Sequence, residues 1–498
     1  MRTAVVILNW NTENFLRDFL PGLIHSVSRV DGAEVVVADN ASTDGSMDVM
    51  QNMFPDIQVI RFEKNLGFTG GYNEAFRILS EEQQKQQKQQ KLQIQQKHLI
   101  HQKPLSAIST PNHTEKTTCT HETQTASFTN ETETTNCTHE TQTTNCKSEA
   151  KTGSPEYFLL INSDIEVRDG WLEPLIEWMD THPECGACAP KLHSWHQKEM
   201  FEYAGAAGGY IDKYGYPFCR GRIMSDIEED RGQYDTPTEV LWATGACLLV
   251  RSSVYAALGG LDNRFFAHME EIDLCWRMKL EGYTVNIVPS SCVWHVGGGT
   301  LPSSSPMKLF LNYRNNLLML SNNLAKTFAV EALNASVLHE SGVGTPVLAE
   351  TSGKDRTNGK DKPNVRNSTP YKDILIEAAY QGIRKANRRI LARMILDGMS
   401  AAVYIITFRW NSMMAVAKAH KQYRKMRRHT DAAVIAEYLG RVTTNKSQCP
   451  DSEKNNIKGK PHIIKPVIKG IYPKWIILQS LIRKNKLPEI IRNWEMNI

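Results

Sequence analysis

Strands and helices alternate along the N-terminal part of the chain. Three short apolar runs, at residues 3–8, 34–38 and 57–62, predict strands. Between the first two runs, apolar residues recur at helical spacing from Phe15 to Ile24, and only Pro21 interrupts them. Repetition of strand, helix and strand predicts a parallel sheet with right-handed crossovers, and therefore an α/β fold.

The segment from Tyr157 to Glu166 contains the strand around which this sheet is predicted to be organised. Its apolar residues suit a strand that is buried on both faces, and the strand ends in Asn162, Ser163 and Asp164. In open α/β sheets, ligands bind beyond the carboxyl ends of the strands. Oxygen-bearing side chains at that place suit a divalent cation. An ordinary polar turn is the alternative interpretation.

Polar or glycine-rich segments follow the other predicted strands in the same way. They occupy residues 9–12, 39–46 and 65–73. The glycines of the third segment allow a close approach of the backbone to a phosphate or a sugar. Asp39, in the second segment, is a candidate acceptor of hydrogen bonds from a nucleoside base or ribose. The alternative interpretation is a carboxylate at the start of a helix.

Acidic residues gather again at the start of a later predicted helix. Asp273 and Arg277 lie four positions apart on one face of this helix, and we interpret them as an ion pair. Glu270 and Glu271 have two interpretations. Either they are favourable charges at a helix N-terminus, or one of them is a base that takes the proton of an acceptor hydroxyl. His295, beyond the next predicted strand, is a candidate metal ligand beside a diphosphate.

Composition divides the rest of the chain. Residues 81–154 are rich in Gln, Lys, Thr and Asn and repeat the hexapeptide Thr-His-Glu-Thr-Gln-Thr, so they predict a disordered or loosely helical insertion. Residues 333–370 predict a flexible linker, residues 371–442 a basic amphipathic helical region, and residues 443–498 a poorly patterned tail. The first domain, which contains the insertion, then comprises residues 1–325.

The charge of the chain restricts its partners. The net charge of +4 is too small to indicate a polyanion partner for the whole chain, and the basic helices lack the interleaved aromatics and motifs of nucleic-acid-binding proteins. From residue 371 onward, however, 25 Lys and Arg stand against 9 Asp and Glu. This excess predicts a peripheral contact with a membrane surface, with an oligomer contact or a solvated helical face as alternatives.

Cysteines and apolar runs predict a cytoplasmic location, and the basic helices predict that it is at the inner face of the membrane. The ten cysteines form no regular framework, which is typical of a reducing compartment, and the lone pair Cys185 and Cys188 gives little support for a zinc site. The apolar run at residues 4–8 predicts a strand, not a signal peptide. No uninterrupted apolar stretch reaches the length of about 18 residues that predicts a membrane-spanning helix.

Six segments of the chain, taken in order, resemble the family 2 inverting glycosyltransferases, and in particular their rhamnosyltransferase-like branch. They read Ile-Leu-Asn-Trp-Asn, Asp-Asn-Ala-Ser-Thr-Asp-Gly-Ser, Asn-Leu-Gly-Phe-Thr-Gly-Gly-Tyr-Asn, Leu-Ile-Asn-Ser-Asp, Ala-Thr-Gly-Ala and Glu-Glu-Ile-Asp-Leu-Cys-Trp-Arg. The resemblance covers residues 3–325 apart from the first insertion. It implies a GT-A fold, with a mostly parallel Rossmann-like sheet flanked by helices, here followed by a C-terminal helical extension.

The resemblance also implies a reaction and a site. A sugar would move from a nucleotide-sugar donor to a glycan or lipid-linked acceptor, with inversion at the anomeric carbon and with Mg or Mn as the divalent cation. Asp164 fills the last position of the family's DxD-type metal motif, with Asn162 in the first, and His295 resembles a late His near the metal or diphosphate. The catalytic base of the family lies in a Glu-Asp pair whose second position is Glu271 here, so Glu271 and Glu270 are both candidates. The predicted donor contacts are Asn9, Asn11, Asp39, Asp44, Gly67, Gly70, Gly71, Asn73, Asn162 and Ser163.

Two other classes of protein fit parts of this pattern. A non-catalytic nucleotide-sugar-binding module would bind the donor without turnover. A sugar-1-phosphate nucleotidyltransferase would carry a basic, glycine-rich phosphate loop near the N-terminus, whereas the first turn, residues 9–12, contains neither Gly nor Lys. A glycosyltransferase is therefore the prediction, with the binding module as its alternative.

Overall fold

The structure, a computed structural model, describes residues 1–101, 154–297, 305–340, 371–444, 468–483 and 486–497. The chain divides into two compact units, one of Met1–Glu81 with Ser154–Ile498 and the other of Glu82–Gly153. The second unit spans nearly the same residues as the predicted insertion. Its described residues, 82–101, are helical, and the rest of the predicted insertion lies outside the described residues.

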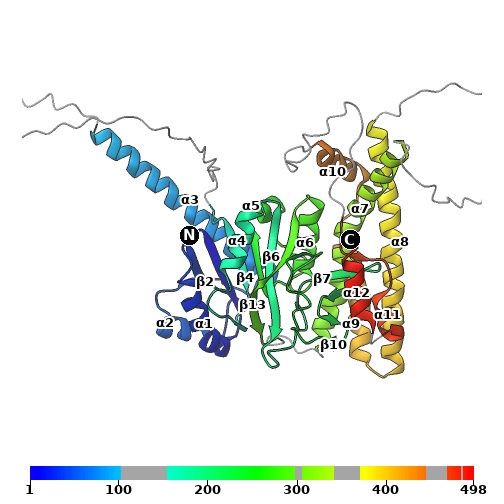
Figure 1. The fold of residues 1–498 in the computed structure, drawn as a ribbon, viewed down its shortest axis with the longest axis horizontal. Helices are drawn as coiled ribbons and strands as arrows, with labels where there is room; N and C mark the ends of the chain where they lie inside the picture. Colours follow the sequence, from blue (N-terminus) through cyan, green and yellow to red (C-terminus); the bar gives the residue numbers. More distant parts are fainter. Residues whose placement is uncertain (102–153, 298–304, 341–370, 445–467, 484–485, 498) are drawn as a thin grey trace, which may run out of the picture. The chain divides into compact units, whose positions relative to one another are not determined.

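A nine-stranded sheet forms the centre of the first unit (Figure 1). Its strands are β1 (Thr3–Asn9), β2 (Ala33–Asp39), β3 (Gln58–Arg61), β4 (Tyr157–Ile161), β5 (Ile165–Glu166), β6 (Cys185–Ser194), β11 (Thr238–Glu239), β12 (Cys247–Arg251) and β13 (Thr284–His295). Their order is β11-β13-β6-β12-β4-β1-β2-β3, and β5 pairs with β13. Strands β3, β2, β1 and β4 are parallel, as the sequence predicts, whereas β12 runs antiparallel to β4 and β6. The α/β fold is confirmed, with a mixed sheet.

Strand β4 is buried on both faces of the sheet, as its apolar run predicts. Phe158 and Leu160 contribute to the hydrophobic core on one face, and Leu159 and Ile161 to the core on the other. Successive side chains of a strand point to opposite faces, so a strand that is covered on both sides needs apolar residues throughout. The prediction for this strand is confirmed.

Helices cover both faces of the sheet. Those of the first domain are α1 (Glu13–Val27), α2 (Ser46–Met53), α3 (Gly67–His101), α4 (Glu173–Thr181), α5 (Ser252–Ala257) and α6 (Glu270–Leu280). Leu16 of α1 and Leu175 of α4 belong to one core, whereas Phe76 of α3 and Trp276 of α6 belong to the other. Both cores hold the strand ends in fixed positions because close-packed interiors deform little.

Helix α3 begins at Gly67, inside the segment that was predicted to be a glycine-rich loop beside the donor. Residues 67–73 are therefore the start of a helix, and the prediction of a loop there is wrong. The glycines serve packing: a methyl group on Gly71 would stand 2.5 Å from the side chain of Leu8, and one on Gly67 would stand 2.4 Å from the ring of Phe266. Gly67 also has a φ of +72°, which a residue without Cβ adopts at little cost.

A second sheet joins the C-terminal segment to the middle of the chain. Its strands are β10 (Asp226–Ile227), β9 (Arg222–Ile223), β8 (Pro217–Cys219), β7 (Gly209–Asp212) and β14 (Ile471–Tyr472), in that spatial order. Helices α11 (Ile476–Arg483) and α12 (Leu487–Glu495) follow β14, and Glu495 lies 2.7 Å from the buried guanidinium of Arg220. The predicted tail thus contains strand and helix, whose partners lie far earlier in the chain and leave no local pattern.

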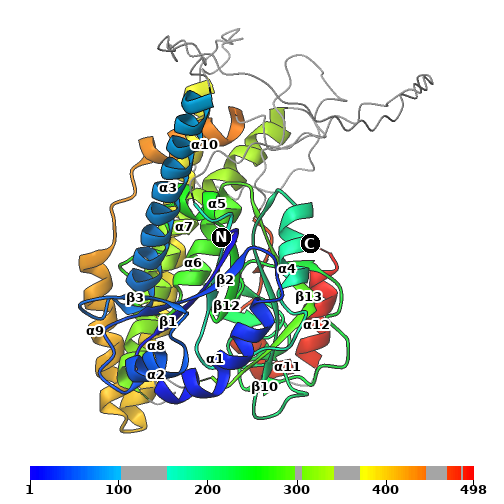
Figure 2. The same cartoon turned by 90° about the vertical axis from the view of Figure 1, so that its left-hand side faces the viewer.

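Four helices make up the C-terminal helical part of the first unit (Figure 2). They are α7 (Pro306–Glu340), α8 (Tyr371–Ile406), α9 (Trp410–Met426) and α10 (Ala432–Thr444). Residues 333–340, predicted to begin a linker, continue α7 because Leu333 is buried; the other linker residues lie outside the described ones. Helices α7 and α8 approach closely at Gly382, where a methyl group would stand 2.5 Å from the carbonyl oxygen of Ala325. Among the helices that the structure describes, none combines the length and the apolarity needed to cross a bilayer.

Candidate active site

The ends of β1 and β2 are joined by a hydrogen-bonded network. Asn9, which is fully buried, donates from Nδ2 to Asp39 Oδ1 (3.0 Å) and to Ser42 Oγ (2.9 Å). The amide of Asn11 donates to the same Ser42 oxygen (3.0 Å). Helix α2 begins only at Ser46, so Asp39 does not lie at the start of a helix, and that alternative interpretation is wrong. The structure therefore brings three of the predicted donor residues together.

Asp44 lies at the junction of two helices. Its Oδ2 accepts the amide of Glu13 (3.0 Å), and its Oδ1 accepts the amide of Ser46 (3.1 Å). Partial burial alone would raise the pKa of Asp44, but the hydrogen bonds from Ser46 and Glu13 lower it. Its carboxylate oxygens thus satisfy the first turns of α1 and α2, a role that the sequence analysis did not assign to it.

The predicted donor residues of α3 make contacts within the protein. Asn73 donates from Nδ2 to the Leu261 carbonyl (2.8 Å) and to Asn263 Oδ1 (2.8 Å). Its Oδ1 accepts from the Tyr255 hydroxyl (2.6 Å) and from the Leu261 amide (3.0 Å). A methyl group on Gly70 would stand 2.9 Å from Leu66 Cβ. Together with Gly67 and Gly71, which pack as described above, Asn73 and Gly70 therefore hold the start of α3 against neighbouring residues.

The end of β4 meets the end of β13 at the two predicted metal ligands. His295 Nε2 lies 3.1 Å from Asp164 Oδ1 and 3.3 Å from Asn162 Nδ2. The amide of Gly297 donates to Asp164 Oδ2 (3.2 Å). Ser163 is half-buried between its two neighbours. The structure thus gathers the polar end of β4 around one imidazole.

Glu202 is a third member of this group, and the sequence analysis missed it. Its Oε1 lies 3.4 Å from His295 Nδ1, and its Oε2 accepts the Ala204 amide (2.6 Å). Burial alone would lower the pKa of His295, but its ion pairs with Asp164 and Glu202 raise it to about 10. Burial alone would raise the pKa of Asp164, but His295 and the amide of Gly297 lower it. An imidazolium therefore lies between two carboxylates at neutral pH.

The donor set at this place fits a divalent cation. Carboxylate and amide oxygens are ligands that Mg and Mn sites use, and each oxygen of Asp164 keeps a lone pair beyond its one hydrogen bond, whereas His295 as an imidazolium has no lone pair for a metal. Asn162 and His295 lie beside it. Within the described residues, no three His, Cys, Asp or Glu side chains form a group that could hold a metal ion. A cation here would depend on oxygen ligands from outside the chain.

Helix α6 carries the acid pair in its first turn. Glu270 is 4% exposed and Glu271 is half-buried, and the Oε2 atom of each has no hydrogen-bond partner among the described residues. Burial and the charge of Glu271 raise the pKa of Glu270 well above its ordinary value. Burial raises the pKa of Glu271 to about 7. Glu271 therefore ionises near neutral pH, which makes it a candidate base.

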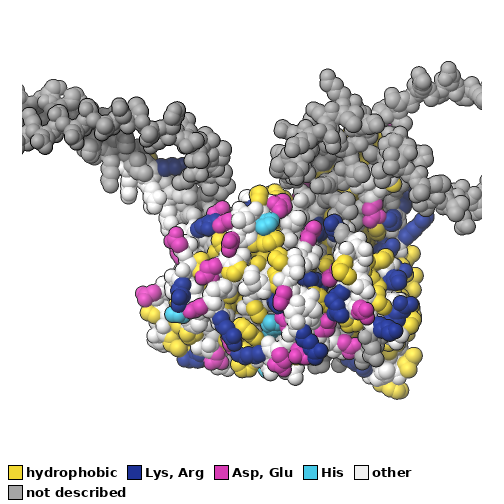
Figure 3. Space-filling model, in the orientation of Figure 1, with side chains coloured by type: hydrophobic (Ala, Val, Ile, Leu, Met, Phe, Trp, Pro, Cys, Tyr) yellow, Lys and Arg dark blue, Asp and Glu magenta, His cyan; other side chains and the backbone are white. Residues whose placement is uncertain are grey.

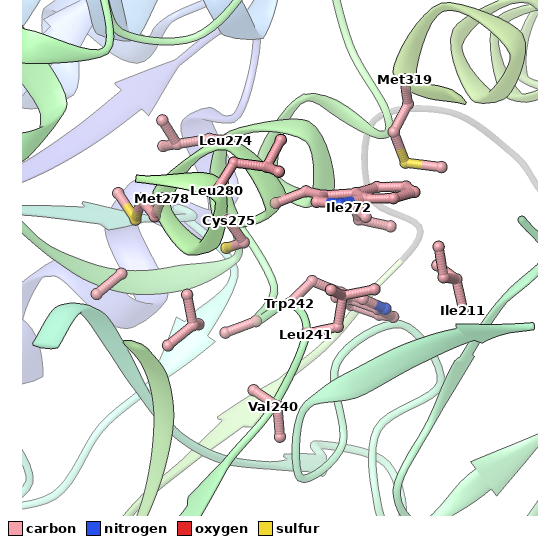
Figure 4. Packing of buried hydrophobic residues seen from close by; sticks show 14 of the residues in the cluster. Ile211, Val240, Leu241, Trp242, Ile272, Leu274, Cys275, Met278, Leu280 and Met319 are labelled. Carbon is pink, nitrogen blue, oxygen red and sulfur yellow. The ribbon is translucent and has the colours of Figure 1, made fainter. Parts of the chain in front are cut away.

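A hydrophobic core holds α6 in place. Figure 4 shows Ile272, Cys275 and Met278 of α6 near Leu241 and Trp242, and all five side chains are buried in one cluster. A helix that is apolar on most of its surface is fixed on several sides. The first turn of α6, with its two acids, is therefore built on a rigid support.

Asp273 and Arg277 form the predicted ion pair. Arg277 Nε lies 2.7 Å from Asp273 Oδ2, and Asp273 is fully buried. Arg277 also donates to the carbonyl oxygens of Leu258 (3.0 Å) and Gly260 (2.9 Å), and Asn323 donates to Asp273 Oδ1 (2.8 Å). The pair is thus structural, as the interpretation of its spacing stated.

The loop before α6 has an unusual backbone. Phe266, His268 and Met269 have φ values of +67°, +71° and +72°, a region that non-glycine residues seldom adopt. The side-chain Nδ2 of Asn315 donates to three carbonyl oxygens of this loop, those of Phe265 (2.9 Å), Ala267 (2.7 Å) and His268 (2.8 Å). Arg314 donates to the Phe265 carbonyl as well (2.7 Å). Residues of α7 thus hold the loop that begins the acid-bearing helix, and nothing in their sequence pattern indicated this role.

A short segment brings the β4 end and the acid pair together. The amide of Asn162 donates to the carbonyl oxygen of Ala246 (2.9 Å). A methyl group on Gly245 would stand 3.5 Å from Cβ of Glu271 and 3.2 Å from the ring of Phe68. The polar end of β4 and the candidate base therefore lie beside two adjacent residues of the Ala-Thr-Gly-Ala segment, Ala246 and Gly245 respectively.

Comparisons with known proteins find similarity to a family over part of the chain. Residues 4–82 match the sequence profile of Glycosyl transferase family 2. A segment of 136 residues, 27% of the chain, is 32% identical to the O-antigen biosynthesis protein RfbC of Myxococcus xanthus and covers 10% of it. A segment of 146 residues, 28% of the chain, is 28% identical to the N-acetylglucosaminyl-diphospho-decaprenol L-rhamnosyltransferase of Mycobacterium tuberculosis and covers 47% of it. The chain thus spans less than half of the length of each of these two relatives.

Solved structures of glycosyltransferases are also similar to this chain. GalNAc-T7 with UDP, GalNAc and Mn2+ is 13% identical, with a TM-score of 0.40 over 64% of this chain and 47% of that one. S. aureus TarS 1–349 is 11% identical, with a TM-score of 0.38 over 85% of this chain and 92% of that one. By sequence, the chain is thus similar to Glycosyl transferase family 2 over residues 4–82 and to proteins that are named as rhamnosyltransferases.

Proposed function

We propose that this chain moves a sugar, with rhamnose as the first candidate, from a nucleotide diphosphate donor to a hydroxyl group of a glycan or lipid-linked acceptor. The transfer is a single displacement with inversion at the anomeric carbon. One observation carries the proposal: the amide of Asn162, beside Asp164, donates to the Ala246 carbonyl, and a methyl group on the adjacent Gly245 would stand 3.5 Å from Cβ of Glu271. A site for the leaving group and a base with a pKa of about 7 are then neighbours.

Glu271 accepts the proton of the acceptor hydroxyl in the proposed reaction. The acceptor oxygen attacks the anomeric carbon, the bond from that carbon to the diphosphate oxygen breaks, and the nucleoside diphosphate leaves with the bonding electrons. Burial and the charge of Glu271 raise the pKa of Glu270, so a second negative charge in the first turn of α6 is disfavoured once Glu271 ionises. Asp39, oriented by Asn9, accepts hydrogen bonds from the nucleoside.

Asp164, with Asn162 and His295 beside it, would hold a divalent cation, Mg or Mn, whose charge would neutralise the diphosphate. The proposed location is the cytoplasm at the inner face of the membrane, where a lipid-linked acceptor is accessible. The mycobacterial relative is named for an N-acetylglucosaminyl-diphospho-lipid, so this class is the first acceptor to try.

A donor screen tests the proposal. The purified chain is incubated with dTDP-, UDP- and GDP-sugars, each with Mg or Mn, and release of nucleoside diphosphate is measured with and without an N-acetylglucosaminyl-diphospho-polyprenol. We expect release from one donor that depends on the acceptor and is lost in Glu271→Gln. Donor binding, measured by calorimetry, without release under any condition would instead favour the non-catalytic nucleotide-sugar-binding module.

A further inference from the structure

Helix α8 turns a row of apolar side chains toward solvent. Leu391, Ile395, Met399 and Val403 recur every four residues, so they share one face over about 18 Å of helix. Their side chains are between 56% and 60% exposed. A row of this kind on a helix in water is unusual because an amphipathic helix normally buries its apolar face.

The row continues around the turn between α8 and α9. Ile406, Phe408 and Trp410 are 75%, 79% and 53% exposed, and Met414 on the first turn of α9 is 46% exposed. Backbone bonds within the turn order it: the amide of Phe408 donates to the Ile405 carbonyl (3.0 Å). Figure 3 shows yellow apolar side chains at the lower right, where Figure 1 draws this turn. We call Leu391, Ile395, Met399, Val403, Ile406, Phe408, Trp410 and Met414 the hairpin patch.

Polar groups occupy the inner side of the same two helices. Asp397 is fully buried, and it accepts from Arg393 Nε (2.8 Å) on α8 and lies 3.1 Å from His420 Nε2 on α9. Arg393 lies over the ring of Tyr216 at 3.7 Å from its centroid. The hairpin therefore buries an ion pair together with apolar residues such as Ile390 and Val416, and still leaves a row of large apolar side chains outside, as expected when the outer surface faces a medium other than water.

The positive charge of this part of the chain indicates which medium the hairpin patch faces. Between Asp397 and Asp431 the chain contains seven Lys and Arg and no Asp or Glu. Exposed cations among them are Arg409 in the turn and Lys418, Lys421, Arg424 and Lys425 on α9. A second copy of the chain would bring the same seven positive charges against these, whereas anionic headgroups would neutralise them. Trp410 at the boundary of the patch suits the level of the headgroups.

We propose that the hairpin patch inserts into the interfacial region of a bilayer that contains anionic lipid. This inference deepens the proposed function and rests on it for the lipid-linked acceptor. In both Figures 1 and 2 the α8–α9 turn lies on the same side of the first unit as α1 and α2, which follow the carboxyl ends of β1 and β2. Docking through the patch therefore turns the edge that carries the candidate site toward the membrane.

Vesicle flotation of the full chain tests this proposal. We expect the chain to float with phosphatidylcholine vesicles that contain phosphatidylglycerol, and much less with phosphatidylcholine alone. The double variant Ile406→Ser and Phe408→Ser is expected to lower the bound fraction at least about tenfold, because two large side chains no longer enter the apolar layer. The matched control is Leu481→Ser with Ile482→Ser, two residues of α11 that are 78% and 66% exposed, and it is expected to float as the wild type does.

A second variant removes charge and leaves the patch intact. Replacing Lys418, Lys421, Arg424 and Lys425 by Gln is expected to weaken binding to the anionic vesicles more than about tenfold. Flotation of the Ile406→Ser and Phe408→Ser variant equal to that of wild type would overturn the proposal. So would a wild-type chain that stays unbound and shows self-association that the same variant abolishes in sedimentation velocity. Nucleoside diphosphate release is measured in parallel without vesicles, so a failure of docking is distinguished from a failure of catalysis.

Discussion

Asp164 Oδ1 lies 3.1 Å from His295 Nε2, although 131 positions separate the two residues in the chain. On its other side the same imidazole faces Glu202, whose Oε1 lies 3.4 Å from Nδ1. All three side chains are buried, so the positive charge of His295 offsets two carboxylates that water does not reach. The buried charge of His295 thus connects the ends of β4 and β13 with the segment after β6.

Replacing His295 by Gln is expected to destabilise the protein. Asp164 and Glu202 would lose their shared counter-charge, and an uncompensated buried charge costs about 3–5 kcal/mol. Urea unfolding at pH 7 measures the change in free energy. The control is His25→Gln, at an exposed histidine of α1, which should leave the free energy of unfolding unchanged. Equal stability of the His295→Gln variant and wild type would contradict the ion pairing described here.

The two acids of α6 are expected to differ in their effect on transfer. Glu271→Gln removes the proton acceptor and should lower kcat by about 100-fold or more, within the contribution of a general base, while donor affinity is kept. Glu270→Gln introduces a neutral group of the same shape in place of a carboxyl group whose pKa is raised by burial and by the charge of Glu271, so its kcat should stay within about threefold of wild type. A reversal of this order in the two variants would assign the base to Glu270.

The rate of transfer should rise with pH through the pKa of Glu271. Below about pH 7 its carboxyl group carries a proton and cannot accept another, so kcat/KM should increase about tenfold per pH unit and level off above pH 7. The Glu270→Gln variant should show the same rising limb. A profile that is flat between pH 5.5 and 8 would show that the base ionises elsewhere.

The free energy of unfolding should fall with rising pH through the ionisation of Glu271, whereas the rate of transfer rises. The pKa of Glu271 is about 7 in the folded protein, against an ordinary value of 4.5, so the folded state holds its proton more tightly than the unfolded state. Stability is therefore lost as pH rises from about 4.5 to about 7. Glu271→Gln removes this loss and should raise the free energy of unfolding at pH 8 by up to about 3 kcal/mol. An unchanged difference between pH 5 and pH 8 in the variant would contradict the raised pKa.

The sequence predicts those parts of the fold that leave a local pattern. Strand β4 was predictable because a strand covered on both faces is apolar throughout, and the Asp273–Arg277 pair because both residues lie on one helix face. The glycines of residues 67–73 were misinterpreted because the same absence of a side chain suits a phosphate loop and a close helix contact.

The missed residues act through contacts between segments that are distant in the chain. Glu202 reaches His295 only after β6 and β13 pair, and Asn315 reaches the loop before α6 only after α7 packs on it. Neither residue belongs to a motif, and its own neighbours do not distinguish it from an ordinary polar residue. Strand β14 is similar, since its partner is β7, in the middle of the chain. Such roles depend on tertiary structure that spacing along the chain does not specify.

Asn315 is expected to support catalysis without contact with substrate. Asn315→Ala removes the side-chain donor of the Ala267 and His268 carbonyl groups and one of two side-chain donors to the Phe265 carbonyl. Phe266, His268 and Met269 should then relax from positive φ values and displace the first turn of α6. We expect kcat to fall about 10- to 100-fold, because small displacements of a catalytic group have effects of this size. The measurement is kcat at a temperature where circular dichroism shows both variants folded. The matched control is Asn316→Ala, which removes a buried hydrogen bond to the Gly215 carbonyl (2.7 Å) and should lower stability but leave kcat near that of wild type. Equal losses of kcat in the two variants would mean that the loop does not position Glu271.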